Sequence, residues 1–247
     1  MSVKKILVSQ ASPAGQPQYT DISNKFGVEI DFHPFYVIEP LSSREFRAQH
    51  INLPDYTAIV FSARHAIDAF FAICEDLRVK VPDTMKYFCT TEAVAVYLQK
   101  HIVFRKRKIF YGTGTPQSVV ALVTAKHKGE KFLIATSGSG HNEVITKLFD
   151  EAHLDTTTGV FVKAVSQDLK GIDINSYDML VMCNPADLKS LRENFPDIDL
   201  SKFKILTFGK QIVKSLEDEG VEIALKAPTP EAPSVAKALE LFLSSQK

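Results

Sequence analysis

The chain of 247 residues has the composition of a globular protein, with 45% apolar and 23% charged residues, and its length suggests one or two domains. Lys plus Arg and Asp plus Glu both number 29, so no net charge would draw the protein to nucleic acid or to a membrane. The N-terminus carries only a short apolar run, and no apolar stretch reaches the roughly 18 residues of a membrane span. We therefore expect a cytoplasmic protein that holds any anionic ligand through local groups.

Short apolar runs typical of buried parallel strands recur along the chain, and most of them lead into a segment with helical periodicity. The expected strands cover residues 6–8, 58–61, 87–89, 132–135, 179–182 and 205–208. The expected helices cover residues 66–71, 93–98, 118–123, 143–149, 188–191, 212–216 and 235–243. Alternating strands and helices predict parallel sheets with helices on both faces.

A weak internal duplication links two parts of the chain. Residues 56–62, YTAIVFS, are echoed by residues 177–183, YDMLVMC. In each copy a lysine-led strand follows about thirty residues after the start, at Lys86 and at Lys204. Self-similarity of this kind indicates repeated structural units, so we expect two units of the same architecture.

The pieces of this repeat stand in a different order in the two copies, because residues 131–152 resemble residues 4–26. This order predicts one discontinuous α/β domain, residues 1–36 plus 164–247, and one inserted α/β domain, residues 37–163. The chain would then cross twice between the domains, through β-rich segments that could pair as a two-strand hinge. The crossings would lie in residues 28–38 and 158–165.

In this order the segments resemble the uroporphyrinogen-III synthase family. The most specific piece is residues 208–220, a strand, a glycine turn and a helix that ends in glycine, followed by Pro-Thr-Pro at residues 228–230. His33-Pro34 in the first crossing and Thr-Ser-Gly at residues 136–138 support it. The resemblance implies two similar Rossmann-like or flavodoxin-like parallel-sheet domains, the first discontinuous, joined by a two-strand β linker.

The sequence also departs from the family pattern. Ser9-Gln10-Ala11 stands where the family often has Thr-Arg-Pro after the first strand, and the tyrosine usual in the second linker falls on Phe161 or Val162. In the middle domain the family's Gly and Thr at the end of the third strand become Thr90 and Ala93. No catalytic residue, and in particular no proton donor, can be assigned from the resemblance.

The resemblance implies a lyase of heme and porphyrin biosynthesis that cyclises hydroxymethylbilane to uroporphyrinogen III, with inversion of ring D through a spiro intermediate. It implies a small-molecule polycarboxylate substrate, no cofactor, no nucleic acid, no membrane, and a monomer in transient contact with the preceding pathway enzyme. The alternative is a non-catalytic two-domain module that closes on a small anionic ligand, because the architecture alone does not specify chemistry.

Ligands of open parallel sheets bind beyond the carboxyl ends of the strands, where the N-termini of the following helices favour anions. We expect the loops at these ends to face a cleft between the domains and to hold the substrate carboxylates. The predicted binding residues are Ser62, Arg64, Thr90, Thr91, Ser137, Gly138, Ser139, His141, Asn184, Gly209, Lys210 and Gln211.

Several of these features have plainer interpretations. Ser62 could cap a helix, Arg64 could be a solvated surface residue, and the small-residue segment 136–141 could be an ordinary loop. Two other motifs favour structural roles. The glycine-rich segment 111–116 is typical of a strand-to-helix turn, and the basic run 105–108 is typical of a solvated face.

The cysteines and histidines do not predict a metal site. Cys74, Cys89 and Cys183 lack CxxC spacing, and each sits in or beside an apolar segment, which favours buried structural thiols. The histidines show neither HExxH nor paired spacing. No phosphate-loop or dinucleotide fingerprint is complete, so neither a metal nor an organic cofactor is expected.

Overall fold

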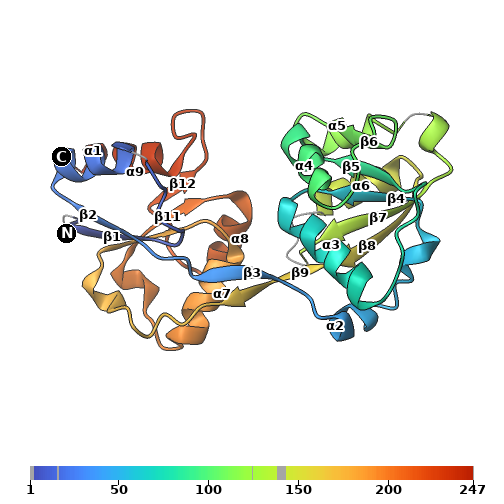
Figure 1. Ribbon diagram of the computed structural model, residues 1–247. Helices are drawn as coiled ribbons and strands as arrows, with labels where there is room; N and C mark the ends of the chain where they lie inside the picture. Colours follow the sequence, from blue (N-terminus) through green and yellow to red (C-terminus); the bar gives the residue numbers. More distant parts are fainter. Residues whose placement is uncertain (1–2, 16, 124, 138–142, 247) are drawn as a thin grey trace. The chain divides into compact units, whose positions relative to one another are not determined.

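The computed structural model describes residues 3–15, 17–123, 125–137 and 143–246, which fall into two compact units (Figure 1). Unit 1 consists of Met1–Val37 with Val165–Lys247, and unit 2 consists of Ile38–Ala164. Each unit has a five-stranded parallel sheet, and a two-stranded sheet lies at the crossings. The predicted fold class, two similar parallel-sheet α/β domains with a two-strand linker, is confirmed.

Unit 1 has the sheet order β12-β11-β10-β1-β2, with every pair parallel. In chain order within the unit this is 2-1-3-4-5, the flavodoxin-like order. Its strands are β1 Lys5–Val8, β2 Glu29–Phe32, β10 Met179–Met182, β11 Lys204–Phe208 and β12 Leu225–Ala227. Its helices are α1 Pro17–Phe26, α7 Pro185–Asn194, α8 Lys210–Asp218 and α9 Val235–Ser245, with short 3-10 turns at Ile174–Ser176 and Leu200–Lys202.

Unit 2 has the sheet order β6-β5-β4-β7-β8, again parallel throughout. Its strands are β4 Ala58–Phe61, β5 Lys86–Cys89, β6 Ile109–Tyr111, β7 Lys131–Thr136 and β8 Asp155–Val160. Its helices are α2 Ser43–Arg47, α3 Arg64–Asp76, α4 Glu92–Tyr97, α5 Pro116–Val120 and α6 Glu143–Glu151. Short 3-10 turns lie at Leu53–Asp55, Leu98–Lys100 and Ala125–His127.

The two sheets have the same arrangement when β1 is matched to β7, β2 to β8, β10 to β4, β11 to β5 and β12 to β6. Their registers agree as well, since Lys5 lies opposite Glu29 in unit 1 and Lys131 lies opposite Asp155 in unit 2. In unit 1 the β1-α1-β2 segment comes first in the chain, whereas in unit 2 the matching β7-α6-β8 segment comes last. The second unit is thus a circular permutation of the first, as the order of the sequence repeat indicates.

Both crossings between the units lie in the two-stranded sheet of β3, Tyr36–Pro40, and β9, Val162–Ser166. The predicted crossing segments include residues that belong to the five-stranded sheets. Residues 29–32 form β2 of unit 1's sheet, and residues 158–160 belong to β8 of unit 2's sheet. β-rich sequence predicts strands without saying which sheet they join, because pairing depends on partners distant in the chain.

The continuous apolar runs of the central strands arise because both faces of each sheet are covered. In unit 1, Ile6 and Val8 pack against α1 and α9, whereas Leu7 packs on the other face against α7 and α8 (Figure 1). In unit 2, Ile59 packs toward α3, whereas Val60 packs toward α5 and α6. This packing fixes the strand ends, and with them the loops that carry the candidate site.

Candidate functional site

All strands of each five-stranded sheet run parallel, so their carboxyl ends share one edge, which we call the carboxyl edge of the unit. The predicted binding residues of unit 1 follow β10 and β11 at its carboxyl edge: Asn184, Gly209, Lys210 and Gln211. Those of unit 2 that the structure describes follow β4, β5 and β7 at its carboxyl edge: Ser62, Arg64, Thr90, Thr91 and Ser137. Gly138, Ser139 and His141 lie outside the described residues.

Gly209 forms a tight turn between β11 and α8 in unit 1. Its φ of +144° is one that side chains disfavour, and an added Cβ would lie 3.1 Å from the carbonyl oxygen of Cys183. Its N–H donates to the carbonyl of Ala227 at 2.8 Å, so this N–H is already engaged. Lys210 and Gln211 stand in the first turn of α8, where N–H groups lack partners within the helix and can serve an anion.

Asn184 caps α7 with its side chain. Its Oδ1 accepts a hydrogen bond from Ala186 N at 3.0 Å, and its own N–H donates to Asp187 Oδ2 at 2.9 Å. Pro185 occupies the first helical position, where its missing N–H costs nothing. The Asn-Pro-Ala-Asp sequence therefore forms a reciprocal capping arrangement, and it places Asp187 inside the carboxyl edge.

Asp187 is a buried acidic residue that the sequence analysis did not single out. Its side chain is 1% exposed, and its Oδ2 accepts hydrogen bonds from the backbone N–H groups of Cys183 at 2.8 Å and Asn184 at 2.9 Å. Burial raises its pKa to about 6, although the two N–H groups and the nearby Ser9 hydroxyl act in the opposite direction. A carboxyl group with this pKa can take up and release a proton near neutral pH.

Ser9, Cys183 and Tyr36 surround this carboxyl group. The Ser9 hydroxyl is buried at the end of β1 and lies near both Asp187 and Cys183. Burial raises the pKa of the Cys183 thiol to about 12, with the charge of Asp187 acting in the same direction. Burial, Asp187 and Cys183 also raise the pKa of Tyr36. These neighbours are neutral at physiological pH, so none of them carries a positive charge that would balance a negative charge on Asp187.

A hollow of about 630 Å³ opens at the same edge, between the loop after β1 and the end of β2. Tyr19 and Phe32 form its aromatic wall, with ring centroids 4.8 Å apart in an edge-to-face arrangement. Hydroxyl groups of Ser12, Thr20 and Ser23 contribute polar lining. Unit 1 therefore offers apolar and hydrogen-bonding surface at its carboxyl edge.

At the carboxyl edge of unit 2, hydroxyl groups make hydrogen bonds that hold the loops in place. Thr91 caps α4, with its Oγ1 accepting from Val94 N at 3.3 Å. The Thr90 hydroxyl donates to the Ser62 carbonyl at 3.3 Å, which ties the loops after β4 and β5 together. Ala63, not Ser62, is the N-cap of α3, so the capping interpretation of Ser62 is wrong and its side chain is exposed.

Arg64 begins α3 and belongs to a cluster of cations around one tyrosine. Its guanidinium carbon lies 5.5 Å from the ring centroid of Tyr97, and the Lys100 ammonium lies 4.4 Å from the same centroid. Asp68 accepts hydrogen bonds from the Tyr97 hydroxyl at 2.7 Å and lies 2.8 Å from His101 Nε2. Arg64 thus stacks on Tyr97 while it remains exposed to solvent, and its positive charge can still bind an anion at the carboxyl edge of unit 2.

The glycine-rich segment 111–116 is a strand-to-helix turn, as its sequence favours. Thr115 caps α5 through its Oγ1, Pro116 takes the first helical position, and Gly112 lies so close to Ser118 that a Cβ would collide with its hydroxyl. In unit 2, Cys74 and Cys89 are free and buried, and burial raises the pKa of each thiol to about 12. Neither thiol is suited to act as a nucleophile.

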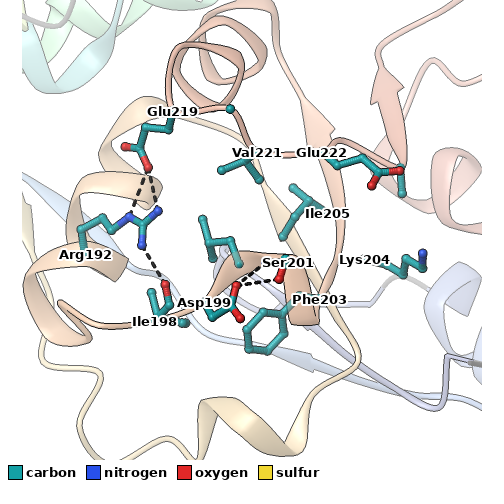
Figure 2. Close-up of a pocket in the computed structure, with 13 residues that line it drawn as sticks. Arg192, Ile198, Asp199, Ser201, Phe203, Lys204, Ile205, Glu219, Val221 and Glu222 are labelled. Carbon is teal, nitrogen blue, oxygen red and sulfur yellow. Dashed lines mark hydrogen bonds and ion pairs between the residues drawn. The ribbon is translucent and has the colours of Figure 1, made fainter.

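A second hollow, of about 450 Å³, lies at the opposite, amino-terminal edge of unit 1's sheet (Figure 2). Two cations line it, Arg192 and Lys204. Arg192 is already paired, because Nε and Nη2 contact Glu219 at 3.2 and 2.8 Å and Nη1 donates to the Ile198 carbonyl at 2.8 Å. The walls also carry Asp199 and Glu222. This hollow is therefore less suited to a polyanion than the carboxyl edge.

The described residues bear on two other classes of function, metal binding and membrane insertion. Among them, no group of three or more His, Cys, Asp or Glu side chains could hold a metal ion. None of the helices they form is long and apolar enough to cross a membrane.

Comparison with known proteins identifies the family. The family model described as Uroporphyrinogen-III synthase HemD matches residues 18–237. A solved mutant uroporphyrinogen III synthase from Thermus thermophilus has a TM-score of 0.53 at 12% identity, covering 99% of this chain and 100% of that chain. The uroporphyrinogen-III synthetase of Helicobacter pylori has a TM-score of 0.58 at 14% identity, covering 98% and 99%. At such identities the structures show a shared fold.

No curated protein matches the chain. The family match nevertheless spans most of its length, and the shared fold extends over both units. The family match supports a uroporphyrinogen-III synthase function and does not favour a non-catalytic binding module. The chain belongs to the uroporphyrinogen-III synthase family, whose members are enzymes of heme biosynthesis.

Proposed function

We propose that the protein is a cofactor-free lyase that cyclises hydroxymethylbilane to uroporphyrinogen III, inverting ring D through a spiro intermediate. The observation that carries this proposal is the family match over residues 18–237. The chemistry also suits the residues present. The linear tetrapyrrole supplies most of the reactivity, so the enzyme's main task is to fold a flexible polyanion into a productive geometry.

The substrate carboxylates are assigned to the carboxyl edges of both units. In unit 1, the first turn of α8 and Lys210 supply N–H groups and a positive charge. In unit 2, Arg64 supplies a guanidinium group suited to bidentate carboxylate contacts. One substrate engaging both edges requires the units to close on it, which a change in solution scattering on adding product would reveal.

A coupled assay with hydroxymethylbilane tests the activity. Spontaneous closure gives the type I isomer, so the proposal requires an excess of the type III isomer that depends on the protein. If only the type I isomer forms, the synthase assignment is wrong, and the alternative of a non-catalytic binding module remains. The products are separated by chromatography after oxidation to the porphyrins.

Matched lysines test which edge binds the substrate. Lys210 lies at the carboxyl edge, and Lys204 begins β11 at the amino edge of the same sheet; both are exposed. Lys210→Ala is expected to raise KM severalfold, whereas Lys204→Ala leaves KM unchanged. Equal effects would place the substrate elsewhere. We further propose that the protein is a cytoplasmic monomer that makes transient contact with the preceding enzyme of the pathway.

A further inference from the structure

Within the described residues, three buried side-chain atoms have no hydrogen-bond partner: Ser9 Oγ, Asp187 Oδ1 and Gln211 Oε1. All three belong to the carboxyl edge of unit 1. Ser9 follows β1, Asp187 is the third residue of α7 after β10, and Gln211 is the second residue of α8 after β11. These strands are neighbours in the order β11-β10-β1. Buried polar atoms are normally paired, so their gathering at one edge requires an explanation.

Unit 2 shows that the fold itself does not require these polar groups. Its matching positions follow from counting along α3 and α4 from their N-caps and from the register of the two central strands. The counterparts are Ala66 for Asp187, Ala93 for Gln211 and Ala135 for Ser9. Alanine thus serves at every one of these positions in a unit of the same architecture. The three unpaired polar atoms of unit 1 therefore destabilise the fold, and the architecture does not require them.

A proton on Asp187 accounts for two of the three unpaired atoms. Oδ2 accepts hydrogen bonds from two backbone N–H groups, whereas Oδ1 has no hydrogen-bond partner, although the Ser9 hydroxyl lies near the carboxyl group. If Oδ1 carries a proton, it becomes a donor, and the nearby Ser9 hydroxyl has free lone pairs to accept. Protonation also removes an uncompensated charge from a site that is 1% exposed.

Among the described residues that face Asp187, none offers a positive charge to a carboxylate. Cys183 follows β10, Tyr36 lies on β3 and Ser9 follows β1, and none of these brings a positive charge. Tyr19 of α1 faces Cys183 and is neutral as well, because burial raises its pKa. Among the described groups that act on Asp187, only hydrogen bonds oppose the effect of burial. A bound polycarboxylate would favour the protonated form further.

We propose that Asp187, in its protonated form, supplies a proton through Ser9 to the hydroxyl group that leaves the substrate at the carboxyl edge of unit 1. The proposal rests on the proposed function. It assigns a proton donor to a chain that has Phe161 or Val162 where the family usually has a linker tyrosine. Ser9 is buried and the following residue, Gln10, is exposed, so Ser9 lies between the buried acid and the protein surface.

The step balances without a co-reactant. The C–O bond of the hydroxymethyl group breaks with its electron pair on oxygen, the Ser9 proton joins that oxygen, and water leaves. The pyrrole nitrogen lone pair forms the new exocyclic double bond, and Ser9 regains a proton from Asp187, which becomes a carboxylate. Ring closure later releases one proton from the attacked pyrrole carbon, and this proton restores Asp187.

Asp187→Asn separates proton transfer from structure. The amide oxygen of asparagine can accept the two backbone N–H bonds and its NH₂ can donate to Ser9, so the variant imitates the protonated acid but cannot release a proton. We expect kcat for the type III isomer to fall about 100-fold or more with little change in KM. Wild-type kcat should decline above the pKa of Asp187 in the complex, and this decline should be absent in the variant. Ser9→Ala should give a comparable loss.

Asp178→Asn is the matched control. Asp178 Oδ2 also accepts two successive backbone N–H groups, from Lys4 at 2.8 Å and Lys5 at 2.9 Å, but at the amino edge of the same sheet. This variant should keep the wild-type kcat and pH profile. Wild-type kcat and pH profile in Asp187→Asn would overturn the proposal.

Infrared spectroscopy tests the proton without relying on activity. The difference between wild type and Asp187→Asn at about pH 5 should contain the C=O band of a protonated carboxyl group. A difference spectrum with only carboxylate bands would overturn the proposal even if the enzyme is active. If the wild type makes only the type I isomer, the proposed function fails while the infrared result still decides whether Asp187 is protonated.

Discussion

Asp187→Asn should change how the stability of the protein depends on pH. The pKa of Asp187 is about 6 in the folded protein, against about 3.9 for an aspartate in an unfolded chain. The folded state therefore binds this proton more tightly than the unfolded state. The stability contributed by the protonated form is fully present below about pH 4 and is lost as pH rises through about 6. Two pKa units correspond to roughly 3 kcal/mol, an upper figure for the loss on ionisation.

Asparagine cannot ionise, so the variant should gain stability relative to wild type as the pH rises. Urea unfolding between about pH 4 and pH 8, followed by far-UV circular dichroism because the chain has no tryptophan, measures the difference. The difference between the two proteins should grow by roughly 3 kcal/mol across this range. Thr91→Ala, which changes no ionisable group, should differ from wild type by a constant amount. A constant difference for Asp187→Asn would refute a raised pKa at this residue.

Three further substitutions test the loops at the carboxyl edges. Gly209→Val should cost about 1–3 kcal/mol and much of the activity, because φ is +144° and Cys183 O lies 3.1 Å from a Cβ; equal unfolding midpoints would contradict this. Thr91→Ala should cost about 1 kcal/mol by removing the cap on Val94 N, and Thr91→Ser should restore it. Ser62→Ala should leave thermal unfolding unchanged and lower type III formation only modestly, since its side chain is exposed and caps no helix; complete inactivity with normal folding would show a catalytic role.

The sequence predicts the centre of each sheet better than its edges. Each of the six expected strands corresponds to one of the three central strands of a sheet: β1, β10 and β11, or β4, β5 and β7. The strands not predicted as parts of these sheets, β2, β6, β8 and β12, are the outer ones. A central strand is covered on both faces and is apolar throughout, whereas an outer strand such as DTTTGV of β8 is partly exposed and lacks that signal.

The predicted binding residues that the structure describes do follow strand ends, because that inference uses only the order of strands and helices. Their individual roles could not be read in the same way. Asn184 and Thr91 are helix caps, and the N–H of Gly209 is taken by Ala227, contacts that depend on backbone geometry. Whether these residues bind substrate stays a prediction.

Asp187 was missed for a different reason. Its burial cannot be inferred from an aspartate near the start of a helix, a position where acidic residues usually lie in solvent. One signal was available: Asn184-Pro185 with Asp187 as the third helical residue is a capping pattern, which predicts that the carboxyl group turns back toward the strand end. Ser9 gave a second signal, since it stands where the chain departs from the family pattern.

The internal repeat makes this asymmetry informative. Two units of one architecture share helix caps, strand register and apolar cores, so the features they share are those the fold requires. Holding carboxylates is a task that both carboxyl edges can perform with helix N-termini and cations. Releasing one hydroxyl group needs a proton at one place only. A buried acid in unit 1, with alanine at the matching Ala66 of unit 2, is the distribution expected if the units divide these tasks, and it assigns the proton chemistry to the edge that contains Asp187.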